Sequence, residues 1–137
     1  MDSVDHAFTT LLHHHSPYYV AKVDTEVREG IALVRAAGGV PVFAHGLATK
    51  RGRVVGDAAV AAMVEAGLLG VEVDHPDHAP DERAHLRGLA ADLDLIVTGS
   101  SDFHGANKAT QIGACTTEPD QFEAILAAGT GSLPFRD

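Results

Sequence analysis

The sequence has one cysteine and few basic residues, and each shortage excludes a class of protein. The single cysteine, Cys115, excludes a disulfide within the chain and fits a reducing compartment. Ten lysines and arginines face nineteen aspartates and glutamates, so the formal net charge is −9, and the basic residues do not cluster. Nucleic-acid backbones are bound through clustered positive charge, so we expect no such partner. A small phosphorylated substrate stays compatible, because bound metal ions reverse the local field.

Long apolar runs are also absent. No segment approaches the run of about 18–20 apolar residues that crosses a membrane, and the first residues lack the pattern of a signal peptide. The chain has 137 residues, of which 45% are hydrophobic, enough for the packed core of about one domain. We therefore expect a cytoplasmic globular protein that does not contact a membrane.

From residue 23 onward, apolar residues at helical spacing alternate with short continuous apolar runs. The first helix has Asp24 or Thr25 as its expected N-cap. Buried strands separated by helices indicate a parallel sheet with helices on its faces, so the predicted class is α/β. Residues 1–22 are expected to be irregular. Helices are expected over 23–37, 57–66, 80–91 and 118–128, and strands over 40–44, 68–73 and 93–99, with 111–117 as a fourth strand if the sheet has four.

Three side chains follow the ends of these strands, where parallel α/β proteins gather functional groups. His45 follows the first strand, and Asp102 and His104 follow the third. Residues two apart in an extended chain point the same way, so Asp102 and His104 can converge on one point. One carboxylate and two imidazoles suit Zn²⁺, Mn²⁺ or Fe²⁺. The alternative is that the histidines make ordinary loop hydrogen bonds and that Asp102 caps a short helix.

Two stretches resemble the PHP-domain phosphoesterases, the polymerase and histidinol phosphatase superfamily. They are "AGGVPVFAHG", residues 37–46, and "GLLGVEVDHPDHAPDERAHLRGLAADLDLIVTGSSDFHG", residues 67–105. "SPYYVAK", residues 16–22, extends the resemblance toward the branch that acts on small nucleotides and short RNA. The resemblance implies a distorted β/α barrel with a metal cluster at the strand ends. Residues 23–137 would be the carboxyl-terminal half of such a domain, a partial barrel with a sheet of three to four strands.

The resemblance also implies which residues bind metal. His45 matches the histidine of the family's "AH" motif, and Asp102 and His104 match its terminal D-x-H motif. Gly46 stands where the family usually has proline, and the early motifs that begin with an H-x-H pair are not found. The pair formed by His13 and His15 is not followed by the expected aspartate, histidine and glutamate, so we do not assign it to the cluster. We therefore expect an incomplete set of ligands.

Substrate contacts are expected from three further residues. Lys22 lies in the "YVAK" stretch that the resemblance places near the active site. His75 and His78 belong to "DHPDH", which has the composition of a chelating site but lies where the family does not usually supply ligands. We expect both histidines to line the pocket, and no catalytic residue is assigned. Additional cations that could meet a phosphate are Lys50, Arg51, Arg53 and Lys108.

The expected function is hydrolysis of phosphate esters of small nucleotides or short RNA by a metal-dependent phosphoesterase, incomplete because the early motifs are absent. The alternative is a non-catalytic PHP remnant that oligomerises or binds metal. A partial barrel leaves a sheet edge unpaired, and such edges must be covered. We therefore expect as partner a second copy of this chain or a separate amino-terminal half, besides the small phosphorylated substrate.

Overall fold

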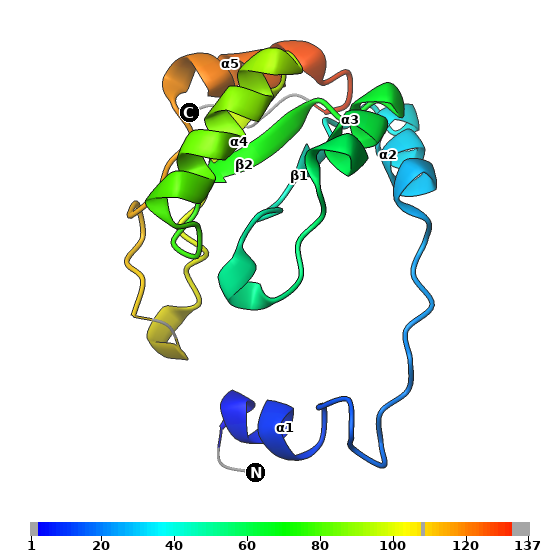
Figure 1. Ribbon diagram of the computed structural model, residues 1–137, viewed down its shortest axis with the longest axis vertical. Helices are drawn as coiled ribbons and strands as arrows, with labels where there is room; N and C mark the ends of the chain where they lie inside the picture. Colours follow the sequence, from blue (N-terminus) through cyan, green and yellow to red (C-terminus); the bar gives the residue numbers. More distant parts are fainter. Residues whose placement is uncertain (1–2, 108, 133–137) are drawn as a thin grey trace.

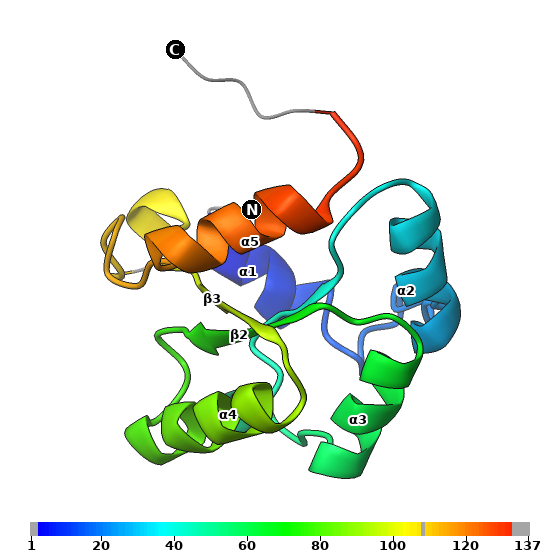
Figure 2. The same cartoon turned by 90° about the horizontal axis from the view of Figure 1, so that it is seen from above.

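The computed structural model describes residues 3–107 and 109–132, and within them a three-stranded parallel sheet lies between helices (Figures 1 and 2). The strands β1 (Val42–Phe43), β2 (Gly70–Asp74) and β3 (Ile96–Gly99) lie side by side in that order. The predicted α/β class with a short parallel sheet flanked by helices is confirmed.

The helices that connect the strands lie on one face of the sheet. Parallel neighbours need a crossover connection, and α3 (Asp57–Glu65) and α4 (Pro80–Asp92) provide the two crossovers. The last helix, α5 (Pro119–Ala128), contacts β3 from the opposite face, as Figure 2 shows. β2 therefore lies in the middle, with a strand on each side and helices above and below.

The first helix of the predicted series begins later than expected. α2 covers Val27–Ala36, and the carboxylate of Glu26, rather than Asp24 or Thr25, accepts hydrogen bonds from two free backbone N–H groups of its first turn. Val23, which fits the helical pattern, is 97% exposed. With no surface to pack against, the apolar residue at position 23 cannot extend the helix.

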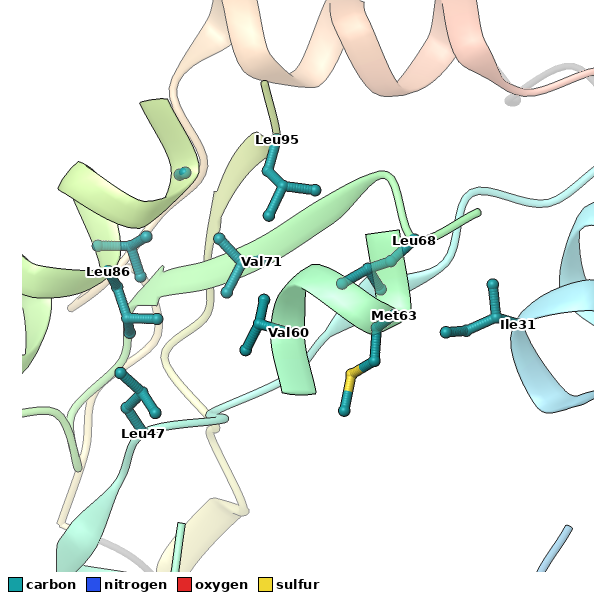
Figure 3. Close-up of a cluster of buried hydrophobic side chains, with 10 residues drawn as sticks. Ile31, Leu47, Val60, Met63, Leu68, Val71, Leu86 and Leu95 are labelled. Carbon is teal, nitrogen blue, oxygen red and sulfur yellow. The ribbon is translucent and has the colours of Figure 1, made fainter. Parts of the chain in front are cut away.

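The hydrophobic core lies between β2 and the helices α3 and α4 (Figure 3). Val60 of α3, Val71 of β2 and Leu86 of α4 are fully buried and meet there. Ile31 and Leu68 extend the cluster toward α2. The core thus fixes β2 against two helices, and the loop that follows β2 starts from a rigid support.

Residues 111–117 do not form a fourth strand of the sheet. The segment runs beside the end of β3, but it is held by side chains: the Thr117 hydroxyl bonds to both backbone groups of Gly99, and the Ser101 hydroxyl to both of Cys115. The backbone approaches so closely that a Cβ at Gly99 would lie 2.3 Å from the carbonyl oxygen of Thr116. Hydroxyl groups therefore replace the backbone ladder that a strand requires.

The amino-terminal segment, expected to be irregular, contains a short helix. α1 (Val4–Thr10) is capped by Ser3, whose hydroxyl accepts a hydrogen bond from the backbone N–H of His6 at 3.0 Å. Figure 1 shows α1 apart from the sheet, joined to α2 by an extended stretch. Among the described residues, no helix is long and apolar enough to cross a membrane.

We predict that Leu86→Ala lowers the free energy of unfolding by about 2–5 kcal/mol, because it leaves a cavity at a fully buried position. Urea denaturation followed by circular dichroism measures the change. Leu33→Ala on α2 is the matched control, since Leu33 is 59% exposed, and it is expected to change stability by less than about 0.5 kcal/mol. Equal losses in the two variants would contradict the position of the core.

Candidate metal centre

The loops that follow β1 and β3 extend to the same side of the sheet (Figure 1). The loop after β1 contains a short 3₁₀ helix, η1 (Thr49–Arg51), and the loop after β3 contains another, η2 (Gly105–Asn107). The turn after β2, which begins at His75, enters the same region. The carboxyl ends of the strands thus bring together segments that are far apart in the sequence, as parallel sheets generally do.

Three side chains form a compact group of potential metal ligands at this end of the sheet. His75, Asp77 and Asp102 each offer one ligand atom, and these atoms lie within 4.8 Å of one another. Nε2 of His75 is 3.6 Å from Oδ2 of Asp102. His75 is only 1% exposed, whereas the two carboxylates are partly buried. All three line a pocket of about 420 Å³ that also includes Lys50 and Thr110.

Two basic side chains from η1 balance the carboxylates. Nε of Arg51 is 2.7 Å from Oδ2 of Asp77, and Nη2 of Arg51 is 2.7 Å from Oδ2 of Asp102. Nζ of Lys50 lies 2.8 Å from the other carboxylate oxygen of Asp77. Hydrogen bonds from Lys50 and then from Arg51 hold the pKa of Asp77 well below its ordinary range, so this carboxyl group is ionised at neutral pH.

The buried histidine of the group is neutral. Burial lowers the pKa of His75, and the nearby carboxylate of Glu72 offsets only part of this effect. Nδ1 of His75 accepts a hydrogen bond from the backbone N–H of Asp77 at 3.0 Å. The ring proton of the neutral form therefore resides on Nε2, which faces Asp102. The loop thus fixes both the orientation and the tautomer of the imidazole.

The donor set fits a divalent metal ion in type and spacing. Two carboxylates and one imidazole are ligands that Zn²⁺, Mn²⁺ and Fe²⁺ accept. Ligation through Nε2 of His75 requires the ring proton to move to Nδ1, at the expense of the hydrogen bond from the Asp77 N–H. The carboxylates of Asp77 and Asp102 need no such change, although Arg51 contacts both.

Of the ligands predicted from sequence, the structure places Asp102 in this group and His45 and His104 beside it. Nδ1 of His104 is 2.7 Å from the backbone oxygen of Asp102, and its side chain is half exposed. The ring of His45 lies against that of His75, with centroids 5.5 Å apart. His45 and Asp102 both have positive φ angles, 37° and 49°, which is uncommon for residues other than glycine. The set His45, Asp102 and His104 stays a prediction.

The residues predicted to bind substrate are dispersed. His75 lines the pocket. His78 is buried behind it, with Nδ1 2.8 Å from the carbonyl oxygen of Val73, and its Nε2 has no hydrogen-bond partner in the described part of the chain. Lys22 lies on the exposed stretch before α2, where it pairs with Asp24. Lys108 lies outside the described residues.

Glu72 was not predicted as part of the site. It is buried in β2, and its carboxylate oxygen Oε2 accepts a hydrogen bond of 2.6 Å from the backbone N–H of His45. This contact fixes the chain where it leaves β1, next to the cluster. A signal was present in the sequence: Glu72 is the one charged residue within the apolar run 68–73. A buried charge needs hydrogen-bond partners, so a charged residue inside an apolar strand indicates a specific contact with another segment.

Comparisons with known proteins agree with the resemblance to the PHP-domain phosphoesterases. A crystal structure of a chain assigned as a metal-dependent phosphoesterase from Bifidobacterium adolescentis is 38% identical, with a TM-score of 0.83 over 92% of this chain and 44% of that one. An amidohydrolase from Chromobacterium violaceum has the same fold, with a TM-score of 0.67 at 21% identity, over 90% of this chain and 44% of that one.

A curated relative extends the comparison. Phosphoribosyl 1,2-cyclic phosphate 1,2-diphosphodiesterase from Eggerthella lenta is 35% identical over 80 residues, which is 58% of this chain and 29% of that protein. The chain matches no model of a known protein family. It has the PHP-like fold of metal-dependent phosphoesterases, and it spans less than half the length of each of these relatives.

We predict that Glu72→Ala lowers the free energy of unfolding by about 1–3 kcal/mol, because it leaves the N–H of His45 without its acceptor. Glu72→Gln keeps an acceptor oxygen and is expected to cost less. Urea denaturation measures both variants. Glu65→Ala, at an exposed position of α3, is the control. A loss no larger than that of Glu65→Ala would mean that Glu72 does not support the site.

Proposed function

We propose that this chain carries part of the active site of a metal-dependent phosphoesterase that hydrolyses phosphate esters of small nucleotides, short RNA or related sugar phosphates. The observation that carries the proposal is the group formed by His75, Asp77 and Asp102 in a pocket at the carboxyl end of the sheet. The 38% identity to a chain assigned as a metal-dependent phosphoesterase supports it.

Some residues of the pocket would bind the metal ion, and others would bind the substrate. When bound, a divalent metal ion supplies activation of water and neutralisation of charge on the phosphoryl oxygens. Asp102 belongs both to this group and to the D-x-H motif, so we propose it as a metal ligand in either set. Asp77 and His75 would complete one set, and His45 and His104 the other. Lys50, whose side chain is 74% exposed at the pocket, is placed to meet a phosphate.

The relatives support a small phosphorylated substrate. The Eggerthella lenta enzyme is named for cleavage of a phosphoribosyl cyclic phosphate. We propose by analogy that the pocket of this chain takes a phosphate ester of that size. A pocket of about 420 Å³ accommodates a nucleotide fragment rather than a long polymer.

We predict that any hydrolysis of a generic phosphodiester such as bis(p-nitrophenyl) phosphate by the purified protein requires added Mn²⁺ or Zn²⁺, and that Asp102→Ala abolishes this turnover and lowers the metal content. Release of p-nitrophenol and elemental analysis of the same untagged sample are the measurements. Asp92→Ala, at an exposed position at the end of α4, is the control. Turnover that does not depend on metal or on Asp102 would contradict the proposal.

Metal content also separates the two ligand sets. His75→Ala should lower the metal content if His75, Asp77 and Asp102 are the ligands, whereas His45→Ala and His104→Ala should lower it if the motif residues are. Unchanged content in a variant removes that histidine from the set.

A second candidate function, as an assembly module, is favoured by an apolar groove beside β1. The groove has a volume of about 440 Å³ and is lined by residues of α2, β1 and α3, among them Val27, Val34 and Phe43. In the described part of the chain, no strand pairs with the outer edge of β1. Unpaired edges next to apolar surface are sites of association. We propose that another polypeptide covers this face, and that in the isolated chain it is a second copy.

We predict a solution mass above the 14.3 kDa of one chain that persists after chelation, because burial of apolar surface does not need the metal. Light scattering coupled to size-exclusion chromatography measures it. Val34→Asp in the groove is expected to shift the protein toward the monomer, whereas Leu33→Asp, on the same helix but outside the groove, is the matched control. A monomeric wild-type protein would contradict the assembly proposal and leave the enzymatic one intact.

A further inference from the structure

We propose that Arg51 is an internal counter-ion of the candidate metal site: it competes with a divalent cation for the same carboxylate oxygens, and the cation, on binding, frees its guanidinium for an anionic substrate. The inference rests on the proposed function, since it concerns the same pocket. It adds that binding of the metal ion and binding of an anionic substrate affect each other's affinity, which neither set of metal ligands implies by itself.

Arg51 contacts all three members of the group. Nε and Nη2 reach Oδ2 of Asp77 and Oδ2 of Asp102, each at 2.7 Å, and Nη2 lies 3.5 Å from Nε2 of His75. A divalent ion held by the same carboxylates would lie close to the guanidinium, and the two positive charges would repel each other strongly. The guanidinium and the ion therefore compete for these carboxylates.

The backbone around Arg51 is anchored, so the side chain is the part that can move. η1 is fixed at its start, where the backbone N–H of Thr49 donates to the carboxylate of Glu82 at 3.1 Å, and the N–H of Arg51 donates to the carbonyl oxygen of Ala48 at 2.8 Å. The Arg51 side chain is 35% exposed, so one side of it already faces solvent. A guanidinium displaced from Asp77 and Asp102 would remain tethered at the edge of the pocket.

The exchange changes the charge of the pocket. With Arg51 in place, two carboxylates face the two positive charges of Arg51 and Lys50, and the group is neutral. Once a divalent ion takes over the carboxylates, the same two basic side chains become a surplus of positive charge beside it. A guanidinium has the planar donor pair that matches two oxygens of a phosphoryl group. Cation binding should therefore increase the affinity for a tetrahedral oxyanion, and by linkage the oxyanion should tighten cation binding.

The experiment is isothermal titration of the full chain with Mn²⁺. Arg51→Ala is expected to bind Mn²⁺ about tenfold more tightly than wild type, the size expected for removing a partly exposed competitor that makes two charged hydrogen bonds. Arg51→Lys keeps the charge but cannot bridge both carboxylates, so its affinity should lie between the two. Arg53→Ala makes the same change in net charge within the same loop and should stay within about twofold of wild type. Circular dichroism verifies that each variant is folded.

A second titration uses sulfate as the anion. Wild-type protein should bind sulfate more tightly with Mn²⁺ present than without it, and this gain should be lost in Arg51→Ala. If wild type binds Mn²⁺ and Arg51→Ala binds it with equal or weaker affinity, the role of Arg51 is overturned and the metal site stands. Absence of Mn²⁺ binding in wild type and both Arg51 variants would overturn the role of Arg51 together with the proposed site. A sulfate gain that survives in Arg51→Ala would overturn the coupling.

Discussion

The burial of β2 is the constraint on which the rest of the structure depends. The strand lies between β1 and β3, and helices cover both faces of the sheet, so nearly every side chain of β2 is removed from water. Any polar group on this strand must then find partners, which is why Glu72 reaches the backbone of His45. His75, directly after the strand, is also buried, and this burial lowers its pKa. The packed strand thus places the carboxylate of Glu72 at the backbone of His45 and the imidazole of His75 in the lining of the pocket.

The electrostatics of the pocket follow from three segments that surround the end of β2. The loop after β2 supplies Asp77, the loop after β3 supplies Asp102, and η1 supplies the two positive charges that face them. An ordinary surface ion pair contributes little to stability, since solvent screens it. Here the carboxylates are partly buried and stand beside the buried imidazole of His75, and the side chains of Lys50 and Arg51 balance their charge.

The part of the relatives that this chain covers and the outer edge of β1 both bear on how the protein could assemble. The chain has the PHP-like fold of metal-dependent phosphoesterases and spans 44% of each solved chain that it matches. Within residues 3–107 and 109–132, no strand pairs with the outer edge of β1, and an apolar groove lies next to that edge. A polypeptide that covers that face, as we propose, would lie close to the end of β1, where the backbone N–H of His45 donates to Glu72 and the ring of His45 lies against that of His75.

Local sequence pattern by itself determined the α/β class, the three strands, the helices from α3 to α5, and Asp102 as a strand-end carboxylate, because these depend on periodicity and on which residues follow an apolar run. Residues 111–117 were a candidate strand from their sequence, but they do not form one. The Thr117 hydroxyl bonds to the backbone of Gly99 in place of a backbone ladder, and hydrophobic periodicity gives no sign of such a side-chain contact. Membership of the cluster was decided by the tertiary structure alone. His75 and Arg51 are separated from Asp102 by 27 and 51 residues, and only the paths of three loops bring them together.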